Sequence, residues 1–208
     1  MKNEVLDAIK SQELISKYVD IPETQVINSL KDLKIKAPLV MKIISSEITH
    51  KTEVGGVVIV HRDNEIESAF NELIFNSKKN KLKLKGILVQ KFVEGTQLII
   101  GLKKDAVFGD VILFGIGGVF TELLDDVSIR KCPINLDEAG EMIYELKSRK
   151  LFEGFRNIKL NTELLKQTIV EVSKIPQKHK NIQELDINPY ILNSREGCAV
   201  DVRVVLEK

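Results

Sequence analysis

The sequence predicts an α+β fold in two lobes, and three observations lead to this prediction. The chain has 208 residues, a length that permits one large domain or two smaller units. Apolar residues make up 43% and charged residues 29% of the chain, which is an ordinary globular composition. Helical patterns are followed by a βαβ-like unit, a run of strands, two helices and a hairpin. This order is typical of α+β proteins.

The charge balance and the cysteines argue against several classes of protein. The chain carries 31 basic and 30 acidic residues, which gives no general reason to expect a nucleic-acid partner. Cys132 and Cys198 stand apart from other potential ligands, which argues against a zinc site or a disulfide framework. The charged N-terminal segment lacks a signal-peptide core, and no apolar run approaches the ~20 residues that span a bilayer. We therefore expect a cytoplasmic protein without a membrane partner.

The first part of the chain shows helical spacing of apolar residues in three segments, at 3–18, 23–34 and 64–78. Pro22 is well placed to open the second helix, and Asp63 or Asn64 to cap the third. Apolar runs between these two helices predict strands at 38–44 and 57–60. A short segment with two glycines separates the strands, which suggests a hairpin.

The second part of the chain begins with a run of strands. We expect strands at 86–95, 96–105 and 109–118, helices at 136–149 and 161–174, and strands at 182–192 and 198–206. The change from helices to strands near residue 85 predicts two domains, 1–85 and 86–208.

Lys42 and the segment "HKTEVGG", residues 50–56, are candidates for phosphate binding. A lysine inside the apolar run "LVMKII" either points out of an edge strand or brings its ammonium to an anion. Gly55 and Gly56 let a backbone approach a ligand closely and expose N–H groups to phosphate oxygens. His50 can donate or accept a proton, or carry a phosphoryl group. The alternative for the segment is a plain turn.

Two further segments have the chemistry of nucleotide binding. The extended "VQKFVEG" can offer backbone N–H and C=O groups to an adenine edge, and the carboxylate of Glu94 can accept two hydrogen bonds from a ribose. The alternative is an ordinary strand end. The glycine-rich "FGIGGVFTELLDD" does not match GxGxxG and opens no βαβ unit, so a Rossmann site is rejected. A close backbone approach to a phosphoryl group remains an alternative there.

The C-terminal hairpin carries the strongest cluster of polar residues. In "ELDINP", period two places Glu184, Asp186 and Asn188 on one face of a strand. A four-residue connection, 193–196, pairs Leu192 with Gly197 and sets Asn188 opposite Asp201. An amide oxygen and a carboxylate at one point suit Mg²⁺. Phosphates and water then complete the coordination of the ion. The alternative is the polar, solvated face of a hairpin.

Three stretches carry a resemblance when they are taken together: "PLVMKIISSEITHKTEVGGV", "ILVQKFVEGTQLIIGLKKDAVFGDVILFGIGGVFTELLDDVSIR" and "ELDINP" with "AVDVR". They closely resemble the ATP-grasp beta subunit of ADP-forming (NDP-forming) acetate–CoA ligase, or acyl-CoA synthetase, over about residues 12–205. The resemblance implies an ATP-grasp fold with a nucleotide held between two α+β lobes. It also implies a reversible reaction in which acyl-CoA, ADP and phosphate become acid, CoA and ATP.

The family also implies partners and cofactors. A separate CoA-binding alpha subunit carries the phosphohistidine that shuttles the phosphoryl group, and it receives the acid and CoA. The expected assembly is a hetero-oligomer such as α2β2, with Mg²⁺ and ATP or ADP bound to the beta subunit. This chain alone is not expected to complete the reaction.

The resemblance assigns roles to residues of this chain. Lys42 matches the strand lysine that contacts nucleotide phosphates, and His50 matches a loop histidine that takes or contacts the phosphoryl group beside Gly55 and Gly56. Asn188 and Asp201 match the Mg²⁺ ligands, and Arg130 matches an arginine implicated in phosphate binding. The nucleoside is expected at the adenine hinge formed by Gln90, Lys91, Phe92 and Val93, with Glu94 as the ribose ligand.

One departure and two rival functions accompany the resemblance. The short strand usual after the family's first glycine- and proline-containing segment is expected to be missing, because "YVDIPETQVINSL" runs into a helical pattern. The rivals are a succinate–CoA ligase-like beta subunit, whose usual GRGK-like loop is absent here, and a nucleotide-sensing regulatory ATP-grasp module. Formation of ADP that depends on an acid, CoA and an alpha subunit distinguishes the three.

Overall fold

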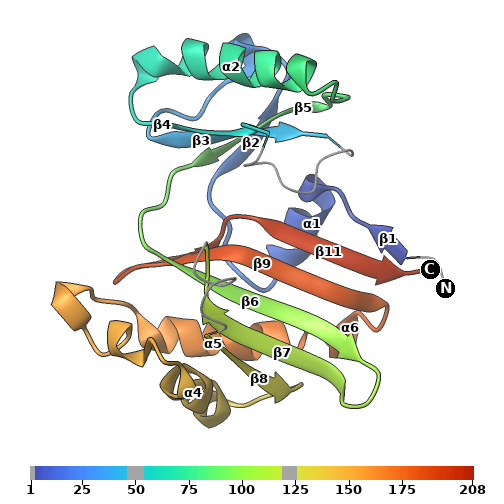
Figure 1. Ribbon diagram of the computed structural model, residues 1–208, viewed down its shortest axis with the longest axis vertical. Helices are drawn as coiled ribbons and strands as arrows, with labels where there is room; N and C mark the ends of the chain where they lie inside the picture. Colours follow the sequence, from blue (N-terminus) through green and yellow to red (C-terminus); the bar gives the residue numbers. More distant parts are fainter. Residues whose placement is uncertain (1–2, 46–53, 119–125) are drawn as a thin grey trace. The chain divides into compact units, whose positions relative to one another are not determined.

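Figure 1 shows the computed structural model of the chain, which describes residues 3–45, 54–118 and 126–208. These residues divide into two units, each with its own sheet and core. The smaller unit comprises residues 22–93, and the larger unit comprises residues 1–21 and 94–208. None of the helices described is long and apolar enough to cross a membrane.

The smaller unit is an antiparallel sheet with a helix on one face. The strand order is β2 (Thr24–Ile27), β5 (Gly86–Lys91), β3 (Leu39–Ile44) and β4 (Val57–Val60). Helix α2 (Ile66–Lys79) packs on the face that carries the alternate apolar side chains. That core contains Leu39, Met41, Ile43, Ile87 and Val89 from the strands with Ala69 and Leu73 from the helix.

The larger unit is built on a second antiparallel sheet. Its order is β1 (Asn3–Val5), β11 (Val202–Glu207), β9 (Ile182–Leu192), β6 (Thr96–Asp105), β7 (Gly109–Ile116) and β8 (Val127–Lys131), and β10 (Gly197–Ala199) also pairs with β9. The helices of this unit are α1 (Ala8–Ile15), α4 (Leu136–Glu145), α5 (Thr162–Ser173) and α6 (Ile175–Lys178).

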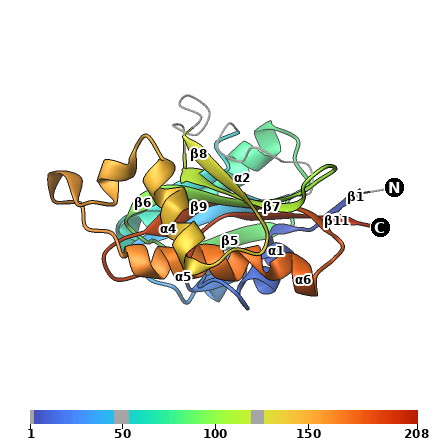
Figure 2. The ribbon, with the colours of Figure 1, turned by 90° about the horizontal axis from the view of Figure 1, so that it is seen from below.

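One face of the larger sheet is apolar and is covered by helices, including α4 and α5 (Figures 1 and 2). Paired residues of neighbouring strands repeat the alternation, so that Leu102, Ile112 and Leu185 lie on this face. On each strand, the residues directly before and after these three point to the opposite face, because successive side chains of a strand alternate. The opposite face is therefore the polar one, and it carries the alternating polar residues of β9.

The structure corrects the prediction of a helix at 23–34. Residues Thr24–Ile27 form β2 and pair with β5, and only a single 3₁₀ turn, Leu30–Asp32, follows. The spacing of Val26, Leu30 and Leu33 is that of a helix. Residues 24–27 are nevertheless a strand, because they hydrogen-bond to the edge that β5 would otherwise leave unpaired. The strand expected to be missing after "YVDIPE" is thus present.

Other differences concern element ends. The predicted helix at 3–18 is divided into β1 and α1, because Asp7 caps α1 by accepting a hydrogen bond from Lys10 N at 3.0 Å. Helix α4 ends at Glu145 rather than at residue 149, and strand β8 was not predicted. The hairpin of β3 with β4 and the helix α2 lie where the sequence predicts them.

The two units also differ from the predicted domains 1–85 and 86–208. Strand β5 lies beyond residue 85 but hydrogen-bonds to β2 and β3 of the smaller unit. At the other end of the chain, Asn3 pairs with Glu207, which joins the N-terminal segment to the larger unit. Long-range strand pairing, which a linear pattern does not reveal, sets the division.

Candidate functional site

Lys42 lies in the smaller unit on the face of the sheet opposite to α2. Its neighbours Met41 and Ile43 belong to the core that α2 covers, so alternation along β3 turns Lys42 the other way. The residue is only 4% exposed. An ammonium group buried to this degree requires polar or anionic surroundings, which is the environment of a phosphate ligand.

Gln90 lies on the same face as Lys42 and has a buried acceptor atom. In the ladder between β3 and β5, Gln90 pairs with Val40, and Lys42 pairs with Leu88, so that the two polar residues are diagonal neighbours. Gln90 is 1% exposed, and its Oε1 accepts no hydrogen bond from any residue that the structure describes. An amide oxygen in this state is available to a ligand that donates a hydrogen bond.

Thr24 fixes the orientation of the Gln90 amide. Its hydroxyl donates to the carbonyl oxygen of Pro22 at 2.7 Å, so toward Gln90 it can only accept. The Gln90 Nε2 atom donates to Thr24 Oγ1 at 3.2 Å, which leaves Oε1 as the outward atom of the amide. The sequence predicts a helix at Thr24, and a residue in a helix would not pair with β5, so its contact with Gln90 is not evident from the sequence.

The segment after β5 presents free backbone groups. The N–H groups of Lys91 and Phe92 donate to the carbonyl oxygens of Glu23 at 2.9 Å and Pro38 at 3.1 Å. The N–H and C=O of Val93, by contrast, bond to none of the described residues. One donor and one acceptor on a single residue match the hydrogen-bonding edge of an adenine.

The glycine pair is held in place by the end of α2. Gly55 has a φ of 61°, and a side chain there would meet Asn76 Nδ2 at 2.7 Å. Asn76 donates from this atom to the carbonyl oxygen of Gly55 at 2.8 Å, and Ile43 N donates to Gly56 O at 2.9 Å. Asn76 is therefore a residue that positions the glycines, and sequence reasoning missed it. His50 lies outside the described residues.

In the larger unit, the register of the C-terminal hairpin is confirmed. Gly197 pairs with Leu192, and the same register continues to Val202 and Ile187. Between these pairs, the N–H of Asn188 donates to the carbonyl oxygen of Asp201 at 3.0 Å. Residues that face each other across antiparallel strands project to the same side. The two predicted metal ligands are thus brought together on the polar face.

The charges around this pair are predominantly negative. Burial raises the pKa of Asp186 to about 6, and the carboxylates of Glu184 and Asp201 add to the rise while Arg203 opposes it. The guanidinium of Arg203 is ion-paired with Glu184. Burial is the main cause of the raised pKa of Asp186, and the two acidic neighbours add to it against the single cation. Sequence reasoning placed Asp186 on this face but gave it no role.

The donor set of this pair fits a magnesium ion. Asn188 supplies an amide oxygen and Asp201 a carboxylate, and Mg²⁺ prefers such oxygen ligands, together with phosphates and water. Among the described residues, no group of three His, Cys, Asp or Glu side chains could hold a metal ion by itself. A metal ion at this position would therefore need further oxygen ligands, such as those of a nucleotide and water.

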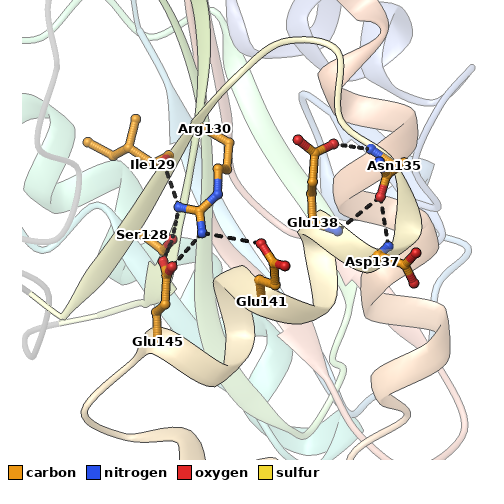
Figure 3. A network of polar contacts seen from close by, with 8 residues as sticks. All are labelled: Ser128, Ile129, Arg130, Asn135, Asp137, Glu138, Glu141 and Glu145. Carbon is orange, nitrogen blue, oxygen red and sulfur yellow. Dashed lines mark hydrogen bonds and ion pairs between the residues drawn. The ribbon is translucent and has the colours of Figure 1, made fainter.

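Arg130 lies on the opposite face from the metal-ligand pair. It pairs with Ile112, a core residue under the helices, and strands β7 and β6 separate β8 from β9. Figure 3 shows its guanidinium against the acidic side of α4, in contact with Glu145 and with Glu141 at 3.8 Å. The structure does not bring Arg130 together with Asn188 and Asp201. The phosphate role expected from the resemblance would require this ion pair to break.

The glycine-rich segment approaches other strands of the protein closely. A side chain at Gly117 would meet the backbone of Leu98 at 2.8 Å, and one at Gly115 would collide with the carbonyl oxygen of Asp126. These glycines are therefore needed for the packing of the sheet itself. Residues 119–125 of this segment lie outside the described residues, and the alternative of a close backbone approach to a phosphoryl group in 114–126 stays a prediction.

Two hollows lie in the larger unit. Glu94 borders one of about 300 Å³, which Ile158, Lys159, Leu160, Leu192 and Asn193 also line. Its backbone carbonyl accepts a hydrogen bond from Asn193 Nδ2 at 2.9 Å, so the position of Glu94 is fixed by the hairpin. A larger hollow of about 630 Å³ lies beside α4 and α5 and contains none of the predicted site residues. We assign no ligand to it, since nothing in its lining resembles the predicted chemistry.

The sequence matches a known family model along nearly its full length. The model of the "ATP-grasp domain" matches residues 1–206. The beta subunit of ADP-forming acetate–CoA ligase I from Pyrococcus furiosus is 34% identical, over 99% of this chain and 93% of that protein. An ADP-forming acetate–CoA ligase from Methanocaldococcus jannaschii is 42% identical over 80% of this chain. The chain spans only 25% of the length of that relative and of a similar Archaeoglobus fulgidus ligase.

Solved structures show the same similarity. The dinucleotide-forming acetyl-coenzyme A synthetase 1 of Ca. Korarchaeum cryptofilum, in complex with coenzyme A and Ca-AMPCP, has a TM-score of 0.93 and 35% identity, covering 98% of this chain and 94% of that one. Another structure of that enzyme holds Mg-AMPPCP, with a phosphohistidine segment that points towards the nucleotide binding site, at a TM-score of 0.83 and 34% identity over 98% of this chain and 93% of that one. The chain therefore has the ATP-grasp fold and belongs to the family of ADP-forming acetate–CoA ligase beta subunits.

Proposed function

We propose that this chain is the nucleotide-binding beta subunit of an ADP-forming acyl-CoA synthetase. The enzyme would reversibly convert acyl-CoA, ADP and phosphate to acid, CoA and ATP through a phosphohistidine. A CoA-binding alpha subunit, in a hetero-oligomer such as α2β2, would supply that histidine and the acid site. The expected cytoplasmic location stays a prediction from the sequence.

The observation that carries the proposal is the pairing of Asn188 with Asp201. The hairpin register brings an amide and a carboxylate to one point on the polar face of the larger sheet. Phosphoryl transfer depends mainly on alignment and on neutralisation of charge. A magnesium ion held by these two residues and by the nucleotide would supply both, and the bound Mg-AMPPCP of the Korarchaeum enzyme supports this assignment.

The smaller unit would bind the rest of the nucleotide. Lys42 would neutralise phosphate charge, and the free N–H and C=O of Val93 would meet the adenine edge. Gln90 would accept a hydrogen bond from the exocyclic amine of the base through its unpartnered Oε1. Glu94, the first residue of the second segment of the larger unit, would accept hydrogen bonds from the ribose hydroxyls. Lys91 and Phe92 would shape the hinge through their backbone bonds to Glu23 and Pro38.

The segment around the glycine pair would receive the phosphoryl group. Gly55 and Gly56, held by Asn76 and by β3, would bring backbone groups close to the phosphate. His50 is proposed, from the family resemblance alone, as the residue that takes or guides the phosphoryl group. Its neutral imidazole is a competent nucleophile for that transfer.

Replacement of a proposed metal ligand tests the site. We expect Asp201→Ala to raise the Kd of Mg·ATP by about tenfold, or about 1.4 kcal/mol, because the ion loses its carboxylate. Titration calorimetry in the presence and absence of Mg²⁺ measures the change. Glu72→Ala removes an exposed carboxylate from the middle of α2 and serves as the matched control. If both variants bind Mg·ATP like the parent chain, Asp201 does not hold the metal.

Reconstitution tests the reaction itself. The chain should bind Mg·ATP alone and should form ADP only when an acid, CoA and the alpha subunit are all present. A range of acids must be tried, because a Nitrosopumilus maritimus relative, 38% identical over 88% of this chain, is a 4-hydroxybutyrate–CoA ligase. Nucleotide binding without turnover under every pairing would favour a regulatory module over a catalytic subunit.

A further inference from the structure

The segment that follows α4 concentrates positive charge in a chain that is close to neutral. Residues 149–159, "RKLFEGFRNIK", contain four basic side chains and one acidic side chain, whereas the whole chain has a net charge of +1. We refer to these residues as the basic arm. The 3₁₀ turns Arg149–Leu151 and Phe155–Asn157 lie within it. A local excess of positive charge attracts surfaces of the opposite charge.

The basic arm is anchored on one side and open on the other. Leu151 and Phe152 pack against the core of the larger unit, and the Phe152 ring lies 6.0 Å from that of Phe114. Among the described residues, none of its four cations forms an ion pair: Arg149, Lys150, Arg156 and Lys159 are exposed and project away from that core. Figure 1 shows the segment as the connection between α4 and α5.

Aromatic and aliphatic side chains are exposed between these cations. Phe155 is 47% and Ile158 is 37% exposed, and Tyr144, at the end of α4, is 66% exposed. Arginine beside aromatic residues is the composition enriched in protein–protein interfaces and their hot spots. The arm therefore has the chemistry of a docking surface as well as its charge.

The backbone holds part of this surface in a fixed, unfavourable conformation. Arg156 has a φ of 49° and a ψ of 41°, in the left-handed region that non-glycine residues rarely adopt. This turn brings its guanidinium to 5.3 Å from the centre of the Phe155 ring, and Arg149 lies 5.0 Å from the centre of the Tyr144 ring. The arginines thus occupy ring faces on which nucleic-acid bases would otherwise stack. A protein partner fits this surface better than a nucleic acid.

We propose that the basic arm is the surface on which this chain docks an acidic face of the CoA-binding alpha subunit. The inference rests on the proposed function, since it is the beta-subunit relationship that requires a partner chain. Complementary charge would steer the encounter, and Phe155 and Ile158 would supply the apolar contact. Ile158 and Lys159, at the end of the arm, border the hollow beside Glu94, whereas Lys150 and Arg156 lie outside its lining.

Charge reversal in the arm tests the proposal. The double variant K150E/R156D reverses two exposed cations, and aspartate is among the residues that tolerate a left-handed backbone. The matched control K31E/K34E makes the same change of net charge at exposed lysines of the smaller unit. The Kd for the separately purified alpha subunit is measured at about 0.05 M and about 0.5 M salt, because screening suppresses contacts between charges. A neutral variant, K150Q/R156N, covers the case in which the reversal fails to fold.

The expected result is a Kd at low salt that is at least about tenfold higher for K150E/R156D than for the parent chain or the control. The neutral variant should show a smaller rise, the difference should shrink at high salt, and Mg·ATP binding should be unchanged in all variants. A Kd and a salt dependence equal to those of the parent would overturn the docking surface and leave the proposed function intact. Binding of single-stranded RNA through the arm would also overturn it. Failure of the parent chain to bind Mg·ATP or the alpha subunit would count against the proposed function itself.

Discussion

At the scale of single residues, the orientation of one buried amide bears on the choice of nucleotide. The Thr24 hydroxyl donates its proton to the carbonyl oxygen of Pro22, so it accepts from the Gln90 Nε2 atom. Gln90 Oε1 is left without a partner among the described residues. Adenine carries a donating amine where guanine carries an accepting carbonyl. At the proposed base site, a fixed acceptor would therefore favour adenine and would oppose the carbonyl acceptor of guanine.

Replacement of Gln90 by methionine should remove this preference. We expect Gln90→Met to weaken ATP binding by about tenfold, because the adenine amine loses the acceptor to which it would donate. GTP binding should change much less, because guanine makes no hydrogen bond to this acceptor. Competition titrations with the two Mg-nucleotides give the ratio of affinities. Gln177→Met makes the same replacement at an exposed position and should leave the ratio unchanged. An unaltered ratio in Gln90→Met would show that the amide does not read the base.

The sequence was sufficient to predict the pairing of Asn188 with Asp201, but it could not place Arg130. In the hairpin, a four-residue connection fixes the register, and period two then determines the face of each residue. No comparable connection is visible before β8, so the face of Arg130 depends on pairing with β7 that only the structure reveals. Gln90 and Thr24 are 66 residues apart, and their contact was equally invisible.

At the scale of elements, polar contacts join β8 to α4. Ser128 Oγ donates to Glu145 at 2.7 Å, and the guanidinium of Arg130 donates to Ser128 Oγ at 3.3 Å and to the carbonyl oxygen of Ile129 at 3.0 Å (Figure 3). The Arg130 guanidinium, and then the Ser128 hydroxyl, lower the pKa of Glu145. Asp126 accepts from the N–H groups of Lys147 and Ser148 at 2.6 and 2.9 Å. The edge strand is thus tied to both the side and the end of the helix.

Removal of Arg130 should lower stability in a pH-dependent way. Because the pKa of Glu145 is lower in the fold than the usual 4.5, the contribution is complete above that pH and is lost as the pH falls through the lowered value. We expect Arg130→Met to cost on the order of 1 kcal/mol at pH 7, since Glu145 is half exposed. Thermal unfolding at a series of pH values should show this difference shrinking below about pH 4.5. Arg62→Met, which breaks the more exposed pair with Glu65, should cost less. A difference that stays constant with pH would contradict the electrostatic origin.

The N-terminal part of the smaller unit shows why the sequence misassigned an element. Val26, Leu30 and Leu33 keep a helical spacing, yet Ile27 alone of β2 enters the core, and Ser29 caps a single turn by accepting from Lys31 N. The pairing of Gln25 with Val89, far along the chain, is what selects the strand. No residue of helix α2 pairs with a strand, and its predicted and observed bounds agree closely.

At the scale of the whole molecule, stability is divided between two separate cores. The core of the smaller unit includes Leu73, which is 0% exposed, and the core of the larger unit includes Phe114 and Tyr190. Each core lies between one face of a sheet and its helices. The opposite face carries Lys42 and Gln90 in the smaller unit, and Asn188 and Asp201 in the larger unit. The packing and these residues are therefore on different sides, whereas Arg130 lies on the covered face.

A cavity in one core should therefore loosen one unit. Leu73→Ala should destabilise the smaller unit by about 3 kcal/mol, because the removed side chain is fully buried. Native-state hydrogen exchange should accelerate in β3 and β5 while the amides of β6 and β9 keep their protection. Ile169→Ala, in the core of the larger unit, should give the converse pattern. An equal acceleration in both sheets would mean that the two cores unfold as one.

The pairing of β1 with β11 has a consequence for how the chain can be connected to others. Asn3 lies opposite Glu207 at the edge of the larger sheet, so the polypeptide enters and leaves at neighbouring points. A short linker could join the two ends, and new ends could be opened in the exposed β6–β7 turn near Val107. The same geometry permits insertion of this fold into a loop of a longer polypeptide without rearrangement of a strand.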